Sequence, residues 1–205
     1  KKINNLSNVI ELNKVQMQGD SIREEIVYKI AEDDIDLQVR VYLDEDSSFV
    51  KYDVTCNWRK IGKHAVDTPQ LSYYLPVNYN CDLYKYGIPF GVIERKGMNI
   101  DVPSNGWVFG QADETRKSAV MLLANAKYGF RSIDNSMAIT LLRSSARPNL
   151  YPEIGVHKFS FAVGVVDNNI SNNELVKIEY DYSHPVSILS VGKTHKGIFG
   201  SSERF

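Results

Sequence analysis

The sequence predicts an all-β fold, a two-sheet antiparallel sandwich with one short helix late in the chain. Three consecutive runs near the start alternate apolar and polar residues, which is typical of strands with one buried face. Short acidic turns join these runs, and no helical periodicity occurs between them. About ten such runs, without alternation of strands and helices, favour two packed antiparallel sheets. The first three runs span residues 22–31, 35–43 and 49–58.

Composition divides the chain into three parts. Residues 1–20 are polar and weakly patterned, and we expect an irregular lead-in segment there. Residues 21–192 carry the strand-like runs and are predicted to form a single β-sandwich domain. Residues 193–205 are rich in Gly and Ser, which predicts a loose tail. The chain starts at Lys1 with neither an initiator Met nor a signal peptide, so we expect a segment of a longer protein.

The run at 35–43 shows the clearest strand pattern. Leu37 and Val39 lie on one face, and Gln38 and Arg40 lie on the other. The runs on either side have the same alternation. The three together predict an antiparallel meander with one face in water.

The stretch from Tyr86 to Arg95 changes from a loop to a strand. Gly87 and Pro89 are typical of a loop. The residues that follow are apolar on both faces, which predicts a short strand buried on both sides. Glu94 and Arg95 end it on opposite faces, at the rim of a core where a site can be built. The simpler interpretation of these two charges is an ion pair at the strand end.

The later elements follow in order. Ser171 and Glu174 have the spacing of a capping box, which starts the single predicted helix and carries it to about Tyr180. Trp58 and Trp107 share strand faces with apolar neighbours, so we expect them in the core rather than on a sugar-binding surface. The other strands are predicted at 70–77, 90–93, 99–102, 107–109, 118–123, 137–143, 158–166 and 186–191.

Charge and cysteine content narrow the class of protein. The formal net charge of −1 gives no basic surface for nucleic acid or an anionic membrane. No apolar run approaches the ~20 residues that span a membrane. Cys56 and Cys81 lack metal-type spacing, and we expect a reduced, cytoplasmic setting.

The residues show no recognisable catalytic or metal motif. The four histidines are not paired at i, i+4 or grouped with carboxylates. A phosphate-binding loop and a nucleophile elbow are both missing from the sequence. We therefore expect no metal and no cofactor in this chain. The four histidines, each expected in a structural role, are His64, His157, His184 and His195.

Six segments, in one order along the chain, carry a family resemblance. Residues 88–95, Ile-Pro-Phe-Gly-Val-Ile-Glu-Arg, are similar to the signature "fGxieRp". This signature and the other five motifs belong to the C-terminal β-domain of glycoside hydrolase family 38 α-mannosidases. The other similar segments are 54–58 ("vDWhe"), 107–108 ("kWvdls"), 122–130 ("LLNDcKYGy"), 140–144 ("lsLLRsP") and 155–159 ("GeHeFtY").

The chain departs from the family pattern at three places. Ala124 and Asn125 stand where the family has Asn-Asp, so one carboxylate is missing. Ser145 replaces a Pro, and residues 149–152 replace an Asp- and Pro-rich loop. These differences suggest a divergent branch, and the resemblance does not define which mannoside linkage is cleaved.

The resemblance implies a galactose-mutarotase-like sandwich that belongs to a larger enzyme. Such an enzyme removes terminal α-linked mannose with retention, using zinc bound in an upstream catalytic domain. Both catalytic carboxyls would lie in that domain, so this chain would supply neither a catalytic residue nor a zinc ligand. The implied partners are that catalytic domain and an α-mannoside or oligosaccharide.

The resemblance also points to residues that could border the substrate. Arg95 is the strongest candidate because its guanidinium is always charged and offers several donors. Tyr128 follows Lys127 in a predicted loop, where its ring could meet a sugar. The substrate-proximal candidates are therefore Arg95, Glu94, Lys127 and Tyr128.

Two alternatives come from other classes of protein. One is a free-standing carbohydrate-binding sandwich. The other is a mutarotase-like epimerase, which needs a His and a Glu facing one cleft, for example His157 with Glu94.

Overall fold

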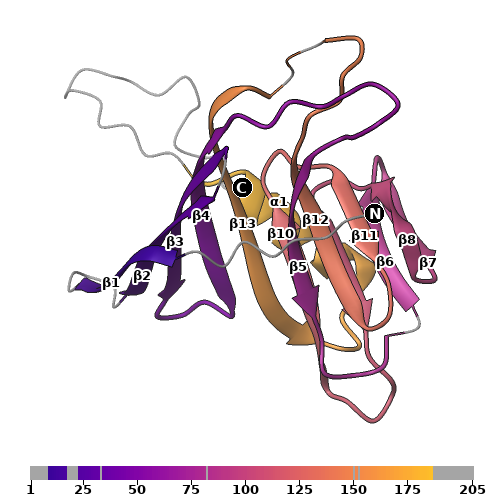
Figure 1. Ribbon diagram of the computed structural model, residues 1–205. Helices are drawn as coiled ribbons and strands as arrows, with labels where there is room; N and C mark the ends of the chain where they lie inside the picture. Colours follow the sequence, from indigo (N-terminus) through magenta and orange to yellow (C-terminus); the bar gives the residue numbers. More distant parts are fainter. Residues whose placement is uncertain are drawn as a thin grey trace, which may run out of the picture.

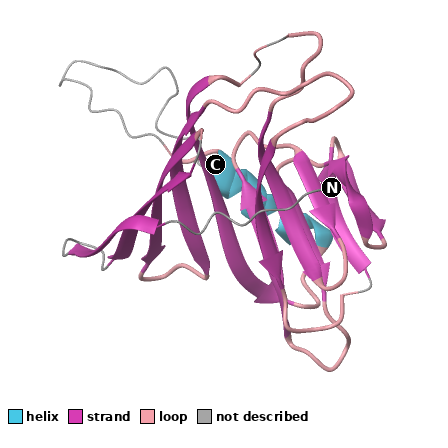
Figure 2. Cartoon of the chain, in the orientation of Figure 1, coloured by secondary structure: helices cyan, strands magenta, loops and turns pink. Residues whose placement is uncertain are grey.

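Thirteen strands in two antiparallel sheets, with one helix, make up the described part of the chain (Figures 1 and 2). This finding confirms the predicted all-β, two-sheet antiparallel fold with a late helix. The computed structural model describes residues 9–17, 23–32, 34–81, 83–149, 151 and 153–186.

The larger sheet contains nine of the described strands. In chain order they are β1 (Val9–Met17), β2 (Arg23–Glu32), β3 (Ile35–Asp44), β4 (Phe49–Trp58), β6 (Leu83–Ile88), β7 (Gly91–Arg95), β9 (Trp107–Gln111), β10 (Ser118–Ala124) and β13 (Gly155–Asp167). Their order across the sheet is β1-β2-β3-β4-β13-β10-β9-β6-β7. β13 therefore joins the first four strands to the other half of the sheet.

The smaller sheet contains four strands and lies in front of the larger one in Figure 1. The strands are β5 (Gln70–Pro76), β8 (Met98–Pro103), β11 (Gly129–Ser132) and β12 (Ser136–Arg143). They are ordered β5-β12-β11-β8, and every pairing between them is antiparallel.

Two apolar cores lie on the two faces of the larger sheet. Val108 and Leu122 enter the core between the sheets, whereas Phe109 and Leu123 point to the opposite face. The helix α1 (Asn172–Ser183) covers that opposite face and contributes the buried Leu175. Burial on both sides explains the almost uninterrupted apolar runs of β9 and β10.

Both tryptophans are core residues, as the alternation predicts, and each is 1% exposed. Trp58 packs between the sheets, and its Nε1 donates to Ser144 Oγ at 2.6 Å. Trp107 packs on the helix side, against the backbone of Gly87. A Cβ at Gly87 would lie 2.3 Å from the indole nitrogen, so only glycine fits there.

The helix begins at the predicted capping box. Ser171 Oγ accepts from the backbone nitrogen of Glu174, and the Glu174 carboxylate accepts from the backbone nitrogen of Ser171. These bonds satisfy donors that a helix start leaves free. The helix ends three residues later than predicted, at Ser183. It is neither long nor apolar enough to cross a membrane.

Three local expectations need correction. Part of the lead-in expected to be irregular forms β1, which pairs with β2. The stretch at 86–95 is a hairpin of β6 and β7, and β7 is a half-buried edge strand rather than one buried on both sides. β11 forms where the sequence indicated a loop. The predicted tail, 193–205, lies outside the described residues, as does the predicted strand at 186–191 apart from Val186.

Candidate functional site

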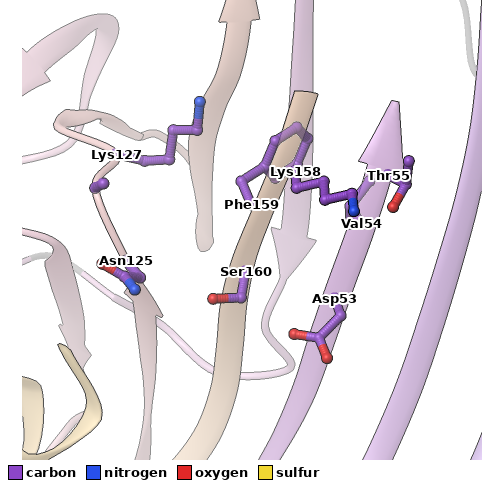
Figure 3. Close-up of a pocket in the computed structure, with 9 residues that line it drawn as sticks. Asp53, Val54, Thr55, Asn125, Lys127, Lys158, Phe159 and Ser160 are labelled. Atoms are coloured by element: carbon purple, nitrogen blue, oxygen red, sulfur yellow. The ribbon is translucent and has the colours of Figure 1, made fainter. Parts of the chain in front are cut away.

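A pocket of about 500 Å³ opens where β10 ends beside β13 (Figure 3). β10 pairs with β13 as far as Ala124, which lies opposite Phe161. The chain then turns away, although Asn125 N still donates to Ser160 O at 3.1 Å. Three segments, from β4, the β10–β11 connection and β13, form the walls. The lining residues are Asp53, Val54, Thr55, Asn125, Ala126, Lys127, Lys158, Phe159 and Ser160.

The pairing of β4 with β13 brings two walls of the pocket together. Asp53 lies opposite Ser160, and Thr55 lies opposite Lys158. Side chains alternate along a strand, so these four share one face. Phe159, between them, belongs to the other face and packs against the core between the sheets. The pocket therefore joins polar groups of one sheet face to an aromatic ring at the edge of the core.

A strained turn shapes the third wall. Ala126 has a φ of 55°, in the left-handed region that a residue with a Cβ rarely adopts. The start of the turn is held by Ala124 N, which donates to Gly106 O at 2.7 Å. Gly106 itself has a φ of 76°, which favours glycine. The connection is thus fixed in a conformation that directs Asn125 and Lys127 to the pocket.

Lys127 is the most perturbed charged group of the pocket. Its Nζ lies 4.8 Å from the centroid of the Phe159 ring, within range of a cation–π contact. Partial burial removes water from the ammonium and lowers its pKa, while the Glu153 carboxylate opposes this shift. The pocket thus presents a partly desolvated cation beside an aromatic ring and a neutral amide, that of Asn125. Such groups can donate hydrogen bonds to hydroxyl or carboxylate oxygens.

The other predicted cation, Arg95, does not line this pocket. Its guanidinium lies 5.2 Å from the centroid of the Tyr86 ring, and Nη1 donates to Pro103 O at 3.4 Å. Glu94 is exposed on the opposite face, with its carboxylate 3.8 Å from Lys85 Nζ. The simpler interpretation, an ion pair at the strand end, agrees with the contact of Glu94 with Lys85, whereas Arg95 contacts a ring and a carbonyl.

Tyr128 and Arg95 bond to neighbouring residues at the end of β8. The Tyr128 side chain is 63% exposed, and the Tyr128 carbonyl accepts from Ser104 N at 3.0 Å. Since Arg95 contacts the carbonyl of Pro103, the adjacent residue, Arg95 and Tyr128 are tied to the same connection after β8. The structure thus brings Lys127 into the pocket, whereas Tyr128 and Arg95 do not line it and are held at the end of β8.

The pair considered for an epimerase is not formed. His157 bonds through Nε2 to Glu153 O at 2.7 Å, and its Nδ1 lies 3.7 Å from the Glu153 carboxylate. Glu94 is on β7, which three strands separate from β13 in the sheet. His157 and Glu94 therefore cannot act together in the mutarotase-like mechanism for which they were considered.

Sequence reasoning missed most of the pocket wall. Asp53, Lys158 and Ser160 are ordinary polar positions of alternating strands, and nothing in their local sequence marks them. They meet because β4 pairs with β13, which follows about a hundred residues later in the chain. No short motif predicts this pairing. Family motifs cover the connection and parts of β4 and β13, but they do not show that these three segments meet at one pocket.

The described residues contain no group of three or more His, Cys, Asp or Glu side chains that could hold a metal ion. The pocket offers a single carboxylate, Asp53, next to two lysines, which is a poor donor set for zinc. No metal chemistry is therefore derived for this chain.

Solved structures share this fold. A protein of glycosyl hydrolase family 38 from Enterococcus faecalis matches with a TM-score of 0.70 and 12% identity, covering 94% of this chain and 27% of that one. An alpha-mannosidase from Enterococcus faecalis V583 matches with a TM-score of 0.66 and 12% identity, covering 87% and 24%. At this identity the likeness concerns the fold alone.

Sequence relatives point to the same family. The chain is 26% identical over 148 residues to "Alpha-mannosidase" of Saccharomyces cerevisiae (strain ATCC 204508 / S288c), which is 68% of this chain and 13% of the yeast protein. The chain thus spans a small part of the length of these relatives. The family model described as "Glycosyl hydrolases family 38 C-terminal domain" matches residues 3–151. Since this match covers well over half of its residues, the chain belongs to the glycosyl hydrolase family 38 C-terminal domains.

Proposed function

We propose that this chain is the non-catalytic C-terminal β-sandwich of an α-mannosidase, and that it supports and borders the active site of a catalytic domain upstream in the same protein. The observation that carries the proposal is the family match over residues 3–151, joined to a relative that bears the name alpha-mannosidase. The whole protein then acts on a terminal α-linked mannose of an α-mannoside or oligosaccharide.

The composition of the pocket supports the non-catalytic role. A retaining glycosidase needs two carboxyl groups about 5–5.5 Å apart, one as nucleophile and one as acid and base. Among the nine pocket residues, all of them described, Asp53 is the only carboxylate. Both reacting carboxyls of a retaining mechanism are therefore assigned to the upstream domain, together with the zinc ion.

Lys127 is the residue through which this domain acts on the site. Its ammonium is partly desolvated, so a hydrogen bond to a sugar hydroxyl or to a catalytic carboxylate forms with little further loss of water. Asn125 adds an uncharged donor and acceptor on the same connection. Tyr128 and Arg95 extend this edge toward the connection after β8 and complete the surface offered to the upstream domain.

We also propose a cytoplasmic location. Cys56 is a free cysteine, and its burial raises the pKa of the thiol to about 11. Thiols of this kind suit a reducing compartment. Fractionation of cells that express the full-length protein tests this location, and recovery from the culture medium or an organelle lumen would contradict it.

The test uses the full-length protein that contains this chain, assayed on an aryl α-mannoside. Lys127→Met should lower kcat/KM about tenfold, or ~1.4 kcal/mol of transition-state stabilisation. The matched control is Lys177→Met on the exposed side of α1, which should keep the wild-type rate. Asp53→Asn should also stay active, because Asp53 is not one of the two reacting carboxyls.

Three results would overturn the proposal. The first is a protein that does not release the aryl group, with or without added zinc. The second is an Asp53→Asn variant that loses about a thousandfold in rate, as removal of a reacting group does. The third, observed by NMR, is a first product of inverted anomeric configuration, which would exclude retention.

A further inference from the structure

The outer face of the four-stranded sheet carries a hydrogen-bonded network that the proposed function does not use. Arg131 Nε and Nη2 contact Asp101 Oδ1 at 2.9 and 2.8 Å. Thr140 Oγ1 donates to Asp101 Oδ2 at 3.1 Å and accepts from Gln70 Nε2 at 2.8 Å. Gln70 Nε2 also donates to Ser72 Oγ at 2.9 Å. These residues come from β8, β11, β12 and β5, so the network crosses the whole sheet.

Small residues keep this face shallow. Ala138 lies between Tyr74 and Arg131 in register, and it is 9% exposed. Gly129 lies against Thr140, where an added Cβ would be 3.3 Å from the Thr140 Cβ. Tyr74 is 59% exposed at the β5 side of this floor. The result is a flat polar floor with one aromatic side chain on it.

The two charges within this network are already matched. The side chains of Arg131 and Asp101 are only 18% and 21% exposed, and they neutralise each other. A charged ligand would have to compete with this pair, and separating a largely buried pair is costly. An uncharged ligand leaves the pair intact and can form hydrogen bonds with the amide and hydroxyl groups beside it.

Among common ligands, a neutral saccharide matches these features best. Each sugar ring offers hydroxyl groups that both donate and accept, spread in a plane, and an apolar C–H face that packs on an aromatic ring. A protein partner would instead need an apolar contact centre. Among the described residues of this sheet, the exposed large apolar side chains are Tyr74 of β5 and Ile100 of β8, too few for such a centre.

We propose that the outer face of the four-stranded sheet is a binding site for a neutral oligosaccharide, with Tyr74 stacking on one ring and the network of Gln70, Thr140 and Asp101 holding the next. The site is separate from the Lys127 pocket, which lies between strands of the other sheet. It does not rest on the proposed function, since a non-catalytic saccharide site can accompany any activity of the whole protein.

The experiment measures binding of a neutral β-1,4-linked mannohexaose, which an α-mannosidase does not cleave, to the full-length protein by titration calorimetry. A saturating concentration of methyl α-mannoside is present throughout, so that a monosaccharide-sized active site is filled. Wild type should bind, and Tyr74→Ala should weaken binding about tenfold, equivalent to ~1.4 kcal/mol. Tyr74→Phe should restore it, because the ring remains. Thr140→Val should also weaken it, through loss of the central hydroxyl.

The matched control is Tyr151→Ala, which removes a ring of similar exposure, 62%, from a loop elsewhere. It should bind as wild type does. Turnover of the aryl α-mannoside should be unchanged in every variant, which separates this site from the proposed function. The inference is overturned if wild type does not bind, if Tyr74→Ala and Thr140→Val bind like wild type, or if an acidic oligogalacturonate competes better than the mannohexaose. Loss of turnover in the Tyr74 variants would show that another part of the protein occupies this face, and would overturn it as well.

Discussion

The ammonium nitrogen of Lys127 lies 4.8 Å from the centroid of the Phe159 ring, so the β10–β11 connection is tied to β13 across the mouth of the pocket. Burial against this ring lowers the pKa of the lysine below its ordinary value of 10.5. The folded protein therefore holds this proton less tightly than the unfolded chain does.

The first prediction follows from this pKa. The unfolded chain binds more protons between the lowered pKa and 10.5, so the free energy of unfolding should rise with pH in that window. Reductive ¹³C-methylation followed by an NMR pH titration would report Lys127 directly, with its signal assigned through Lys127→Arg. Lys127 should titrate below the ordinary lysine value of 10.5. A midpoint at or above that value would contradict this.

The second prediction concerns Arg95 and rests on the proposed function. Arg95→Ala in the full-length protein should lower kcat/KM on an aryl α-mannoside by about tenfold at unchanged melting temperature. Arg116→Ala is a close control, because Arg116 lies 5.4 Å from the Tyr79 ring centroid and donates to a backbone carbonyl, as Arg95 does. An equal loss of kcat/KM in both variants, or a loss accompanied by a lower melting temperature, would mean that Arg95 only supports the fold.

The third prediction concerns the two buried tryptophans. Trp58→Ala and Trp107→Ala should each cost about 3–5 kcal/mol of unfolding free energy. Trp58→Phe should cost less, since it keeps most of the apolar volume and loses the bond to Ser144. Denaturant unfolding followed by circular dichroism measures these differences. A variant with an unchanged midpoint and weaker sugar binding would instead support a stacking role.

The fourth prediction concerns the tip of the β6–β7 hairpin. Phe90 has a φ of 67° and an exposed side chain, so its ring gains little contact to offset the left-handed backbone. That backbone costs a residue with a Cβ roughly 1–2 kcal/mol, and Phe90→Gly should raise the unfolding free energy by up to about 1 kcal/mol. Ile61→Gly, at an exposed position outside the positive-φ group, should lower it. If both substitutions change the free energy of unfolding in the same direction, backbone strain does not explain the effect at Phe90.

Much of the fold follows from local pattern, and the exceptions have physical reasons. The β3 and β4 strands are predictable because alternate residues, such as Leu37 and Val39 or Val54 and Cys56, face the core. The β6 strand has the same signal, since Tyr84 and Tyr86 are buried on either side of Lys85, but the Gly and Pro that follow suggested a loop. The sequence of a strand does not show whether the strand lies at the edge of a sheet. For this reason β7 was expected to be buried on both sides.

The site was harder to predict than the fold. A family motif located Lys127 and Tyr128, and the structure places the first of them in the pocket. The opposite wall, with Asp53 and Ser160, depends on the pairing of β4 with β13, which is a long-range property of the sheet. Arg95 was assigned to the site from a family motif and from its chemistry, and its absence from the pocket lining reflects the position of β7 at the sheet edge.

The place of β13 in the larger sheet has a consequence for how the chain folds as it is synthesised. β13 is inserted between β4 and β10, and residues 155–167 leave the ribosome about a hundred residues after β4. Until then β4 and β10 each expose an unpaired edge, which can recruit strands of other chains. Closure of the sheet also depends on contacts distant in sequence, which slows folding. A nascent chain that stalls before Gly155 is therefore a substrate for chaperones and a source of aggregation.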